Sequence, residues 1–370
     1  MIRSILMLGF WAALLPVAAL VGFPWTLITN DDNNPNSSTV FNLNPNNGSL
    51  TQVMTLATGG ATYQGGYFAA QSQIISPNAN CIFVADGGDP ADIAAFSKAT
   101  HYSKVGSYTN AALKGGTNMP MIENSQGTLL YAAYESSFNI GVWTINPDCS
   151  LTLANAYAAP DFLGSFALTH DGKTLLATYI IINKIGSWTI SGSTLTNNGE
   201  VKSIAKFPSS ISVTNDDQVV IVGVGYTTTQ GSTLITASLP GLTNQKAWTL
   251  GTGYSAGSVA LSPDASAGSG CLYIGNTGLG ASNESGVTGV MFTENPLNLT
   301  YVNNVVSPQA AEMGTVETIT NKGNGGGVYA AETTGYIGVY SASANCAVKL
   351  VKETQDPNST SLLSLTPWVQ

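Results

Sequence analysis

Residues able to do chemistry are few in this chain, and most of them are acidic. The 370 residues include 21 Asp and Glu, 12 Lys and Arg, two His and four Cys, and the net charge is −9. The only arginine is Arg3. If the first residues are removed, no guanidinium group remains that could bind an anion through two parallel hydrogen bonds. The sequence has no serine-nucleophile elbow with a histidine partner, no His-rich metal spacing and no phosphate loop before a helix. An active site would have to use carboxylates, tyrosines, lysines and backbone groups.

The elements that must position these groups belong to a unit of roughly 45 to 58 residues that recurs along the chain, which is typical of a β-propeller blade. Six turns mark its copies, at residues 76–78, 124–127, 169–172, 214–217, 262–264 and 320–323. An apolar strand rich in β-formers follows each turn, as in residues 81–86. Aromatic residues then recur on the third strands, and we expect them to pack between blades: Phe41, Phe96, Trp143, Trp188, Phe292 and Tyr340.

A seventh, incomplete copy precedes the six. Residues 27–30, 39–43 and 50–53 match a second, third and fourth strand, whereas an innermost strand is missing. Residues 362–365 follow the last complete blade and have no blade of their own, so we expect them to close the ring by pairing inside the first blade. The prediction is an all-β, seven-bladed propeller of four-stranded antiparallel blades forming a single domain over residues 25–370. Six or eight blades remain possible, because the region around residues 263–288 is longer than its counterparts.

Placing the polar residues on these blades gives candidate sites. Glu123, Glu312 and Glu317 fall on or beside innermost strands and are the candidate catalytic groups. The candidate ligand-binding residues lie on loops near the channel: Tyr63, Tyr67, Lys114, Asp161 and Tyr254. A channel lined by carboxylates could hold a divalent metal that activates water. The two histidines, His101 and His170, fall on turns of the opposite face and are expected to be surface residues.

A calcium site is the other metal hypothesis. Asp86 and Asp89, in the segment Asp86-Gly87-Gly88-Asp89, carry oxygen atoms of the kind that Ca²⁺ prefers. The segment lacks the alternating ligand order of a calcium loop, and Asp residues also serve tight turns by capping the backbone. The turn interpretation is favoured, and no other cofactor is predicted.

The four cysteines occupy a duplicated arrangement. Cys81 and Cys271 begin second strands, whereas Cys149 and Cys346 lie in the turn between third and fourth strands of the blade that follows. These two places share a face of the disc, which favours the pairs Cys81–Cys149 and Cys271–Cys346. Four cysteines allow three pairings, so the sequence leaves the others open.

Charge is expected to be concentrated on the face that carries the loops between blades and the loops between second and third strands. The carboxylates assigned to it are Asp31, Asp32, Asp86, Asp89, Asp92, Glu135, Asp161, Glu284, Glu312 and Glu332. Such an acidic loop face would repel nucleic acid, because phosphate binding needs clustered Lys and Arg.

The first residues resemble a targeting signal. Arg3 precedes an apolar run over residues 5–15, and Val17-Ala18-Ala19 offers small residues for cleavage, so residues 1–19 are predicted to be a signal peptide. An uncleaved membrane anchor is the alternative, which Pro16 and the shortness of the run disfavour. We therefore expect a secreted, monomeric protein with no stable membrane span and with disulfide bonds, which are typical of an oxidising compartment.

The turn-and-strand unit, as in Ser76-Pro77-Asn78-Ala79-Asn80-Cys81, resembles the repeat of the lactonase-like seven-bladed propellers, a group that includes phosphogluconolactonases, carboxymuconate cyclases and YVTN-repeat surface proteins. The resemblance covers the chain from about Trp25 to the end and implies the fold more than the chemistry. Enzymes of that group would be expected to use basic residues in the channel, which this chain lacks. Two hypotheses follow. The favoured one is a secreted or cell-surface module that binds a small molecule, glycan or protein, or serves as a scaffold, through its acidic loop face. The alternative is a lactone hydrolase or cycloisomerase that acts at the channel mouth with carboxylates and a divalent metal.

Overall fold

The computed structural model describes residues 25–44, 46–62, 72–116, 119–225, 232–250, 255–262, 268–277, 285–294, 296–319, 327–362 and 364–369. The predicted signal peptide lies outside these residues. In the described part, no helix has the length and apolar character needed to cross a membrane. The described residues include two short 3-10 helices, Lys98–Thr100 and Glu135–Ser137.

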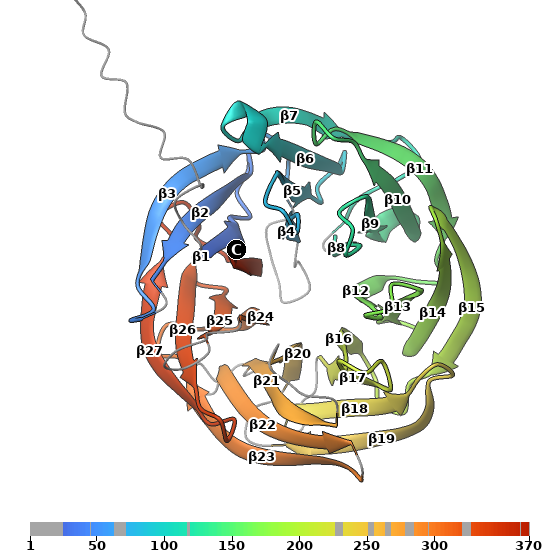
Figure 1. Ribbon diagram of the computed structural model, residues 1–370, viewed down its shortest axis with the longest axis vertical. Helices are drawn as coiled ribbons and strands as arrows, with labels where there is room; N and C mark the ends of the chain where they lie inside the picture. The colour runs from blue at the N-terminus through green and yellow to red at the C-terminus, as the bar shows by residue number, and fades with distance from the viewer. Residues whose placement is uncertain are drawn as a thin grey trace, which may run out of the picture.

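Seven four-stranded antiparallel sheets form a ring around a central channel, which confirms the predicted propeller (Figure 1). The blades are numbered here from the N-terminus, each from its innermost strand outward. Blade 1 consists of β28 (Ser364–Val369), β1 (Trp25–Asn30), β2 (Ser37–Leu43) and β3 (Leu50–Ala57). Blade 2 consists of β4 (Gln73–Ile75), β5 (Cys81–Asp86), β6 (Asp92–Ser97) and β7 (Ser103–Tyr108). Blade 3 consists of β8 (Met121–Glu123), β9 (Leu129–Tyr134), β10 (Asn139–Ile145) and β11 (Leu151–Ala158).

The other four blades follow the same order. Blade 4 consists of β12 (Leu163–Leu168), β13 (Thr174–Tyr179), β14 (Lys184–Ser191) and β15 (Thr194–Lys202). Blade 5 consists of β16 (Pro208–Val213), β17 (Val219–Val224), β18 (Ser232–Ser238) and β19 (Thr243–Leu250). Blade 6 consists of β20 (Ser255–Leu261), β21 (Ser269–Thr277), β22 (Gly286–Glu294) and β23 (Leu297–Val306). Blade 7 consists of β24 (Met313–Thr318), β25 (Gly327–Glu332), β26 (Tyr336–Ala342) and β27 (Val348–Gln355).

Ring closure joins the two ends of the described chain. Strand β28 pairs antiparallel with β1, from Trp25 opposite Val369 to Asn30 opposite Ser364. Figure 1 shows the C-terminal strand beside β1 at the inner edge of blade 1. The expected closure is thereby confirmed, and it gives both β1 and β28 a neighbouring strand.

The core lies between neighbouring blades. All six third-strand aromatics predicted to pack there are buried, with at most 3% of each residue exposed: Phe41, Phe96, Trp143, Trp188, Phe292 and Tyr340. In blades 3 and 4 the indole N–H of the third-strand tryptophan donates to a second-strand tyrosine hydroxyl, from Trp143 to Tyr134 at 3.2 Å and from Trp188 to Tyr179 at 3.0 Å. The aromatic surfaces thus pack between adjacent sheets, while the indole N–H of each tryptophan is satisfied within its own blade.

The two ends of the ring have different connections. We call the end that carries the links between blades and the loops between second and third strands the loop face, and the other end the turn face. Both predicted disulfides are present near the turn face, Cys81–Cys149 and Cys271–Cys346, with Cα atoms 5.5 and 5.2 Å apart. Each bridges consecutive blades, as the duplicated placement predicted.

Candidate functional site in the central channel

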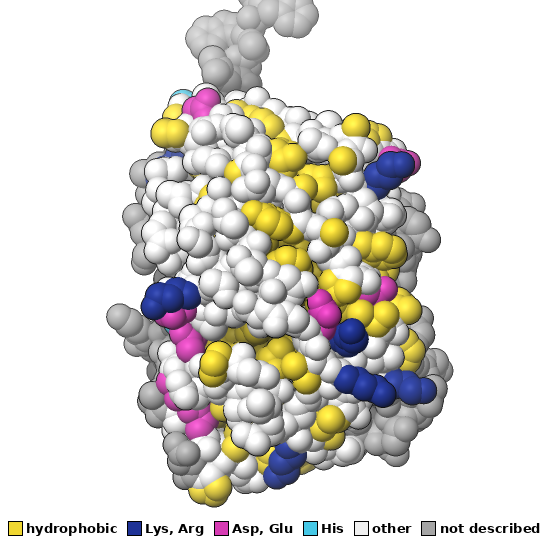
Figure 2. All heavy atoms as spheres, turned by 90° about the vertical axis from the view of Figure 1, so that its right-hand side faces the viewer, with side chains coloured by type: hydrophobic (Ala, Val, Ile, Leu, Met, Phe, Trp, Pro, Cys, Tyr) yellow, Lys and Arg dark blue, Asp and Glu magenta, His cyan; other side chains and the backbone are white. Residues whose placement is uncertain are grey.

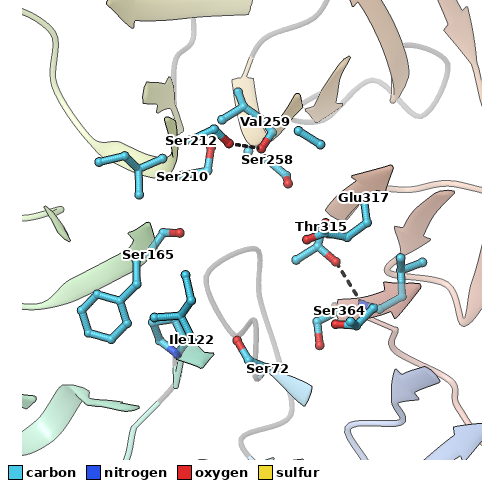
Figure 3. Close-up of a pocket in the computed structure, with 18 of the residues that line it drawn as sticks. Ser72, Ile122, Ser165, Ser210, Ser212, Ser258, Val259, Thr315, Glu317 and Ser364 are labelled. Atoms are coloured by element: carbon cyan, nitrogen blue, oxygen red, sulfur yellow. Dashed lines mark hydrogen bonds between the residues drawn. The ribbon is translucent and has the colours of Figure 1, made fainter. Parts of the chain in front are cut away.

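The innermost strands enclose a cavity of about 420 Å³ whose described lining combines small polar residues with apolar ones such as Ile122, Phe166 and Leu261. Hydroxyl side chains recur around it: Ser72, Ser165, Ser209, Ser210, Ser212, Ser258, Thr315, Thr318, Ser364 and Thr366. Figure 3 shows Ser165 and Glu317 pointing into the central space from opposite sides. Glu317 is the only charged side chain in the described lining.

Several of these hydroxyl groups are used to join one innermost strand to the next. Ser212 donates to the carbonyl of Val259 at 2.9 Å, and Thr318 donates to the carbonyl of Leu261 at 2.7 Å. Thr315 accepts from the backbone N–H of Leu365 at 3.0 Å. These bonds link innermost strands of neighbouring blades, which belong to separate sheets in the described part of the chain.

Glu317 is the ionisable carboxyl group that the structure places in the described lining of the channel. It is the fifth residue of β24 and is half-buried, and burial raises its pKa to about 7. A carboxyl group with such a pKa exchanges a proton readily near neutral pH, which suits a general base or acid.

The other two candidate carboxylates lie elsewhere. Glu123 ends β8 on the turn face, where its Oε2 accepts from the Ser76 hydroxyl of blade 2 at 3.2 Å, and burial raises its pKa to about 7. Glu312 precedes β24 on the loop face, and burial raises its pKa as well. Five residues of extended chain separate Glu312 from Glu317, which corresponds to about 16 Å along the channel. The three carboxylates therefore do not form one cluster.

His170 lies at the turn-face end of the channel. It lines a second cavity, which shares Ile122, Phe166 and Ser212 with the first. Asp217, from the corresponding turn of blade 5, holds it: Oδ1 accepts from the His170 backbone N–H at 2.7 Å and lies 2.9 Å from the ring Nδ1. The histidine is on the expected face, but its place at the channel end and its carboxylate partner were not predicted.

The predicted ligand-binding residues, like the candidate carboxylates, are not brought together in the described structure. Lys114 is exposed on the link between blades 2 and 3, where its backbone N–H donates to the Ser137 hydroxyl at 3.1 Å. The Asp161 side chain is nearly buried, and its Oδ2 accepts the backbone N–H groups of Ile181 and Ile182 at 3.0 and 2.9 Å. Tyr63, Tyr67 and Tyr254 lie outside the described residues.

The expectation of an exposed acidic loop face is wrong for four of its carboxylates. Asp31, Asp32, Asp86 and Glu332 expose at most 2% of their surface. Loops of adjoining segments cover them, as the contacts of Asp86 show: its Oδ1 accepts from Asn36 Nδ2 at 2.7 Å and from Thr58 Oγ1 at 2.9 Å, both in blade 1. The repeat pattern does not show which loops of a neighbouring blade cover these strand ends, so the burial of these carboxylates was not predicted.

Metal binding gains no support from the candidate pair. Asp86 is buried and its pKa is raised to about 8, chiefly by burial, whereas Asp89 is exposed. A carboxyl group that is protonated near neutral pH is a poor calcium ligand. Among the described residues, no three His, Cys, Asp or Glu side chains lie close enough together to hold a metal ion.

Comparison with known proteins identifies the fold. No family model and no curated protein sequence matches the chain. Among solved structures, a candidate 6-phosphogluconolactonase from Bacteroides fragilis matches with a TM-score of 0.70 and 18% identity, over 93% of this chain and 97% of the other. The periplasmic gluconolactonase of Pseudomonas aeruginosa matches with a TM-score of 0.68 and 14% identity, over 93% of this chain and 99% of the other. The predicted resemblance to lactonase-like propellers is confirmed at the level of the fold.

Proposed function

We propose that the protein binds a small, uncharged polyhydroxy compound of the sugar or sugar-lactone class in its central channel. The observation that carries this proposal is the lining: hydroxyl groups recur around it, and one carboxyl group is its only charged member among the described residues. Hydroxyl side chains both donate and accept, as sugar hydroxyls do. A cavity of about 420 Å³ also has the size of small-molecule sites.

The lining disfavours anionic ligands. A phosphate or carboxylate buried in the channel would need a cation or several strong donors, since an unpaired buried charge is costly. The described lining contains no lysine, and Arg3 is the only arginine of the chain. An unphosphorylated sugar or lactone is therefore preferred over its phosphorylated form.

Lactone hydrolysis is the second candidate, favoured by the raised pKa of Glu317 and by the likeness to lactonase structures. In this reaction the Glu317 carboxylate would remove a proton from a water molecule whose oxygen adds to the lactone carbonyl carbon. The ring C–O bond then breaks, and the released alkoxide takes the proton back, which leaves a hydroxy acid and the starting carboxylate.

Binding and turnover are tested together on a panel of sugar lactones, the parent sugars and the phosphorylated lactones. Binding is measured by titration calorimetry, and hydrolysis by base consumption at constant pH. We expect neutral compounds to bind and Glu317→Gln to weaken binding or abolish turnover. Glu123→Gln is the matched control, because Glu123 has a similar pKa but does not line the cavity. Binding of phosphorylated compounds alone, or equal effects of the two variants, would contradict the proposal.

We further infer that the protein is exported. The two disulfides and the likeness to a periplasmic protein support this placement. Mass spectrometry of the protein recovered from culture medium should find a new N-terminus close to residue 20, and an intact Met1 would contradict cleavage.

A further inference from the structure

Exposed apolar side chains gather at one part of the loop face. In the described part of the chain, eight large hydrophobic residues are exposed, and four of them lie on loops or links of blades 3 to 5. These four, called the apolar ridge, are Phe138, Ile181, Ile182 and Ile204, exposed by 45, 60, 36 and 53%. Figure 2 faces the side of the ring that carries β11 and β15 and shows hydrophobic side chains beside lysines toward one edge.

Hydrogen bonds hold the segments of the apolar ridge against one another. The carbonyl of Phe138 accepts from Ala159 N at 2.7 Å, in the link that also carries Asp161. Asp161 then accepts from Ile181 and Ile182, as described above. The loop continues to Asn183, whose carbonyl accepts from Ser203 N at 2.8 Å, next to Ile204. The backbone segments that carry the four side chains are therefore bonded to one another.

Lysines surround the apolar ridge. Lys184, Lys202 and Lys206 lie on the segments of the ridge or on the adjoining strand ends, and Lys114 lies on the link between blades 2 and 3, which is bonded to Ser137. They are four of the eleven lysines of the chain, since one of the 12 basic residues is Arg3. Lys184 and Lys202 are partners across β14 and β15. The acidic groups nearby are Glu135, the nearly buried Asp161, and Glu200, whose Oε2 lies 3.7 Å from the Lys184 Nζ. These four lysines form a local group of positive charges in a chain whose net charge is −9.

We propose that the apolar ridge docks the protein on an anionic phospholipid surface, with the four side chains entering the headgroup region and the lysines contacting the lipid phosphates. Apolar groups flanked by lysines are the combination that holds peripheral proteins on such membranes. The lysine charges match anionic lipid, and a fluid surface can receive side chains from separate loops without a matching groove. The ridge lies outside the channel, so this proposal is independent of the proposed ligand.

The test is co-sedimentation of the full chain with vesicles of phosphatidylcholine, alone or mixed with phosphatidylserine. We expect binding to the mixed vesicles only, weakened by high salt, because screening removes the lysine contribution. Ile181→Asp combined with Ile204→Asp should lower the partition coefficient by about ten-fold or more. The matched control is Met291→Asp combined with Val351→Asp, which alters two apolar residues of similar exposure on β22 and β27.

Equal binding of both double variants, or no binding of the native chain to the mixed vesicles, would overturn the proposal. Dimerisation of the native chain, abolished by the ridge variant in light scattering, would assign the apolar ridge to a second copy instead. Unchanged circular dichroism and thermal unfolding of the ridge variant are required, so that lost binding is not lost folding. Asp161→Asn weakens the acceptor of the Ile181 and Ile182 backbone N–H groups. It should reduce binding to the mixed vesicles by a smaller factor than the ridge double variant does.

Discussion

Glycines on the third strands make room for the buried tyrosines of the adjacent second strands. In blade 4, a β-carbon added to Gly186 would lie 2.5 Å from Cε2 of Tyr179, and in blade 3 one added to Gly141 would lie 2.9 Å from Cε2 of Tyr134. Both tyrosines are fully buried and are held by the tryptophan bonds described above. These glycines are required for side-chain packing and not for an unusual backbone angle.

Gly186→Ala should therefore destabilise the protein by overpacking. The added methyl would displace Tyr179 from Trp188, and we expect the free energy of unfolding to fall by about 1–3 kcal/mol. Urea unfolding followed by tryptophan fluorescence measures the change. Gly241→Ala is the control, because its added carbon would meet only the Thr243 methyl at 3.3 Å, and it should change stability by less than about 0.5 kcal/mol. Equal effects would show that Gly186 has no special packing role.

Residue type predicted the apolar contacts better than the polar ones. Phe96 and Trp143 recur once per repeat, and this periodicity alone placed them correctly in the core. Asp86 was assigned to the loop face from its place at the end of a second strand, and its burial was not predicted. Its burial depends on Asn36 and Thr58, which are 50 and 28 residues away in the sequence and belong to another blade. No pattern in the sequence around Asp86 identifies such distant partners.

Each of the two disulfides connects a pair of consecutive blades. Cys81 and Cys149 are 68 residues apart, and Cys271 and Cys346 are 75 apart, so each bond closes a long loop in the unfolded chain. The duplicated placement favoured the two pairs that the structure shows, because it follows from the order of strands within a blade, although the sequence left the other pairings open. The blade, as an element, was thus readable from the sequence.

Replacing Cys81 and Cys149 by serine should lower the free energy of unfolding by about 2–4 kcal/mol, since the unfolded chain regains the entropy of a long loop. Chemical unfolding with and without a reducing agent measures this effect. The variant that keeps the Cys271–Cys346 bond should lie between the native protein and the fully reduced protein. A variant as stable as the native chain would mean that this bridge does not stabilise the ring.

The orientation of the innermost strands was beyond the reach of the sequence. Registers shift within or beside β12, β16, β20 and β24, near the start of each strand. A shift of one residue exchanges the two faces of a strand. Whether a residue such as Ser165 faces the channel therefore depends on bulges that alternation cannot reveal. The closure of the ring and the place of Glu317 on an innermost strand were predicted, whereas the hydroxyl lining of the channel was not.

Buried carboxyl groups distributed around the ring make the stability of the whole molecule depend on pH. Burial is the main cause that raises their pKa values, to about 8 for Asp86 and to about 7 for Asp31, Glu123, Glu294, Glu317 and Glu332. In the unfolded chain such groups titrate near pH 4. Folding therefore takes up protons between about pH 4 and pH 8, and the stability that these protons contribute is complete below about pH 4 and lost above about pH 8.

Asp86 is the group with which to test this dependence. Burial and the carboxyl group of Asp92, the residue opposite it on β6, raise the pKa of Asp86, whereas Asn36 and Thr58, which donate to its Oδ1, lower it. We expect the urea midpoint of the native protein to fall from about pH 5 to about pH 8. Asp86→Asn keeps a neutral donor toward Asp92, so its midpoint should fall less steeply and exceed the native value at the higher pH. Asp89→Asn, at an exposed site three residues further on, should retain the native slope. If the urea midpoint of the native protein does not change with pH, the buried carboxyl groups are ionised in the folded protein. If Asp86→Asn leaves the slope of midpoint against pH unchanged, the proton uptake belongs to the other buried carboxyl groups.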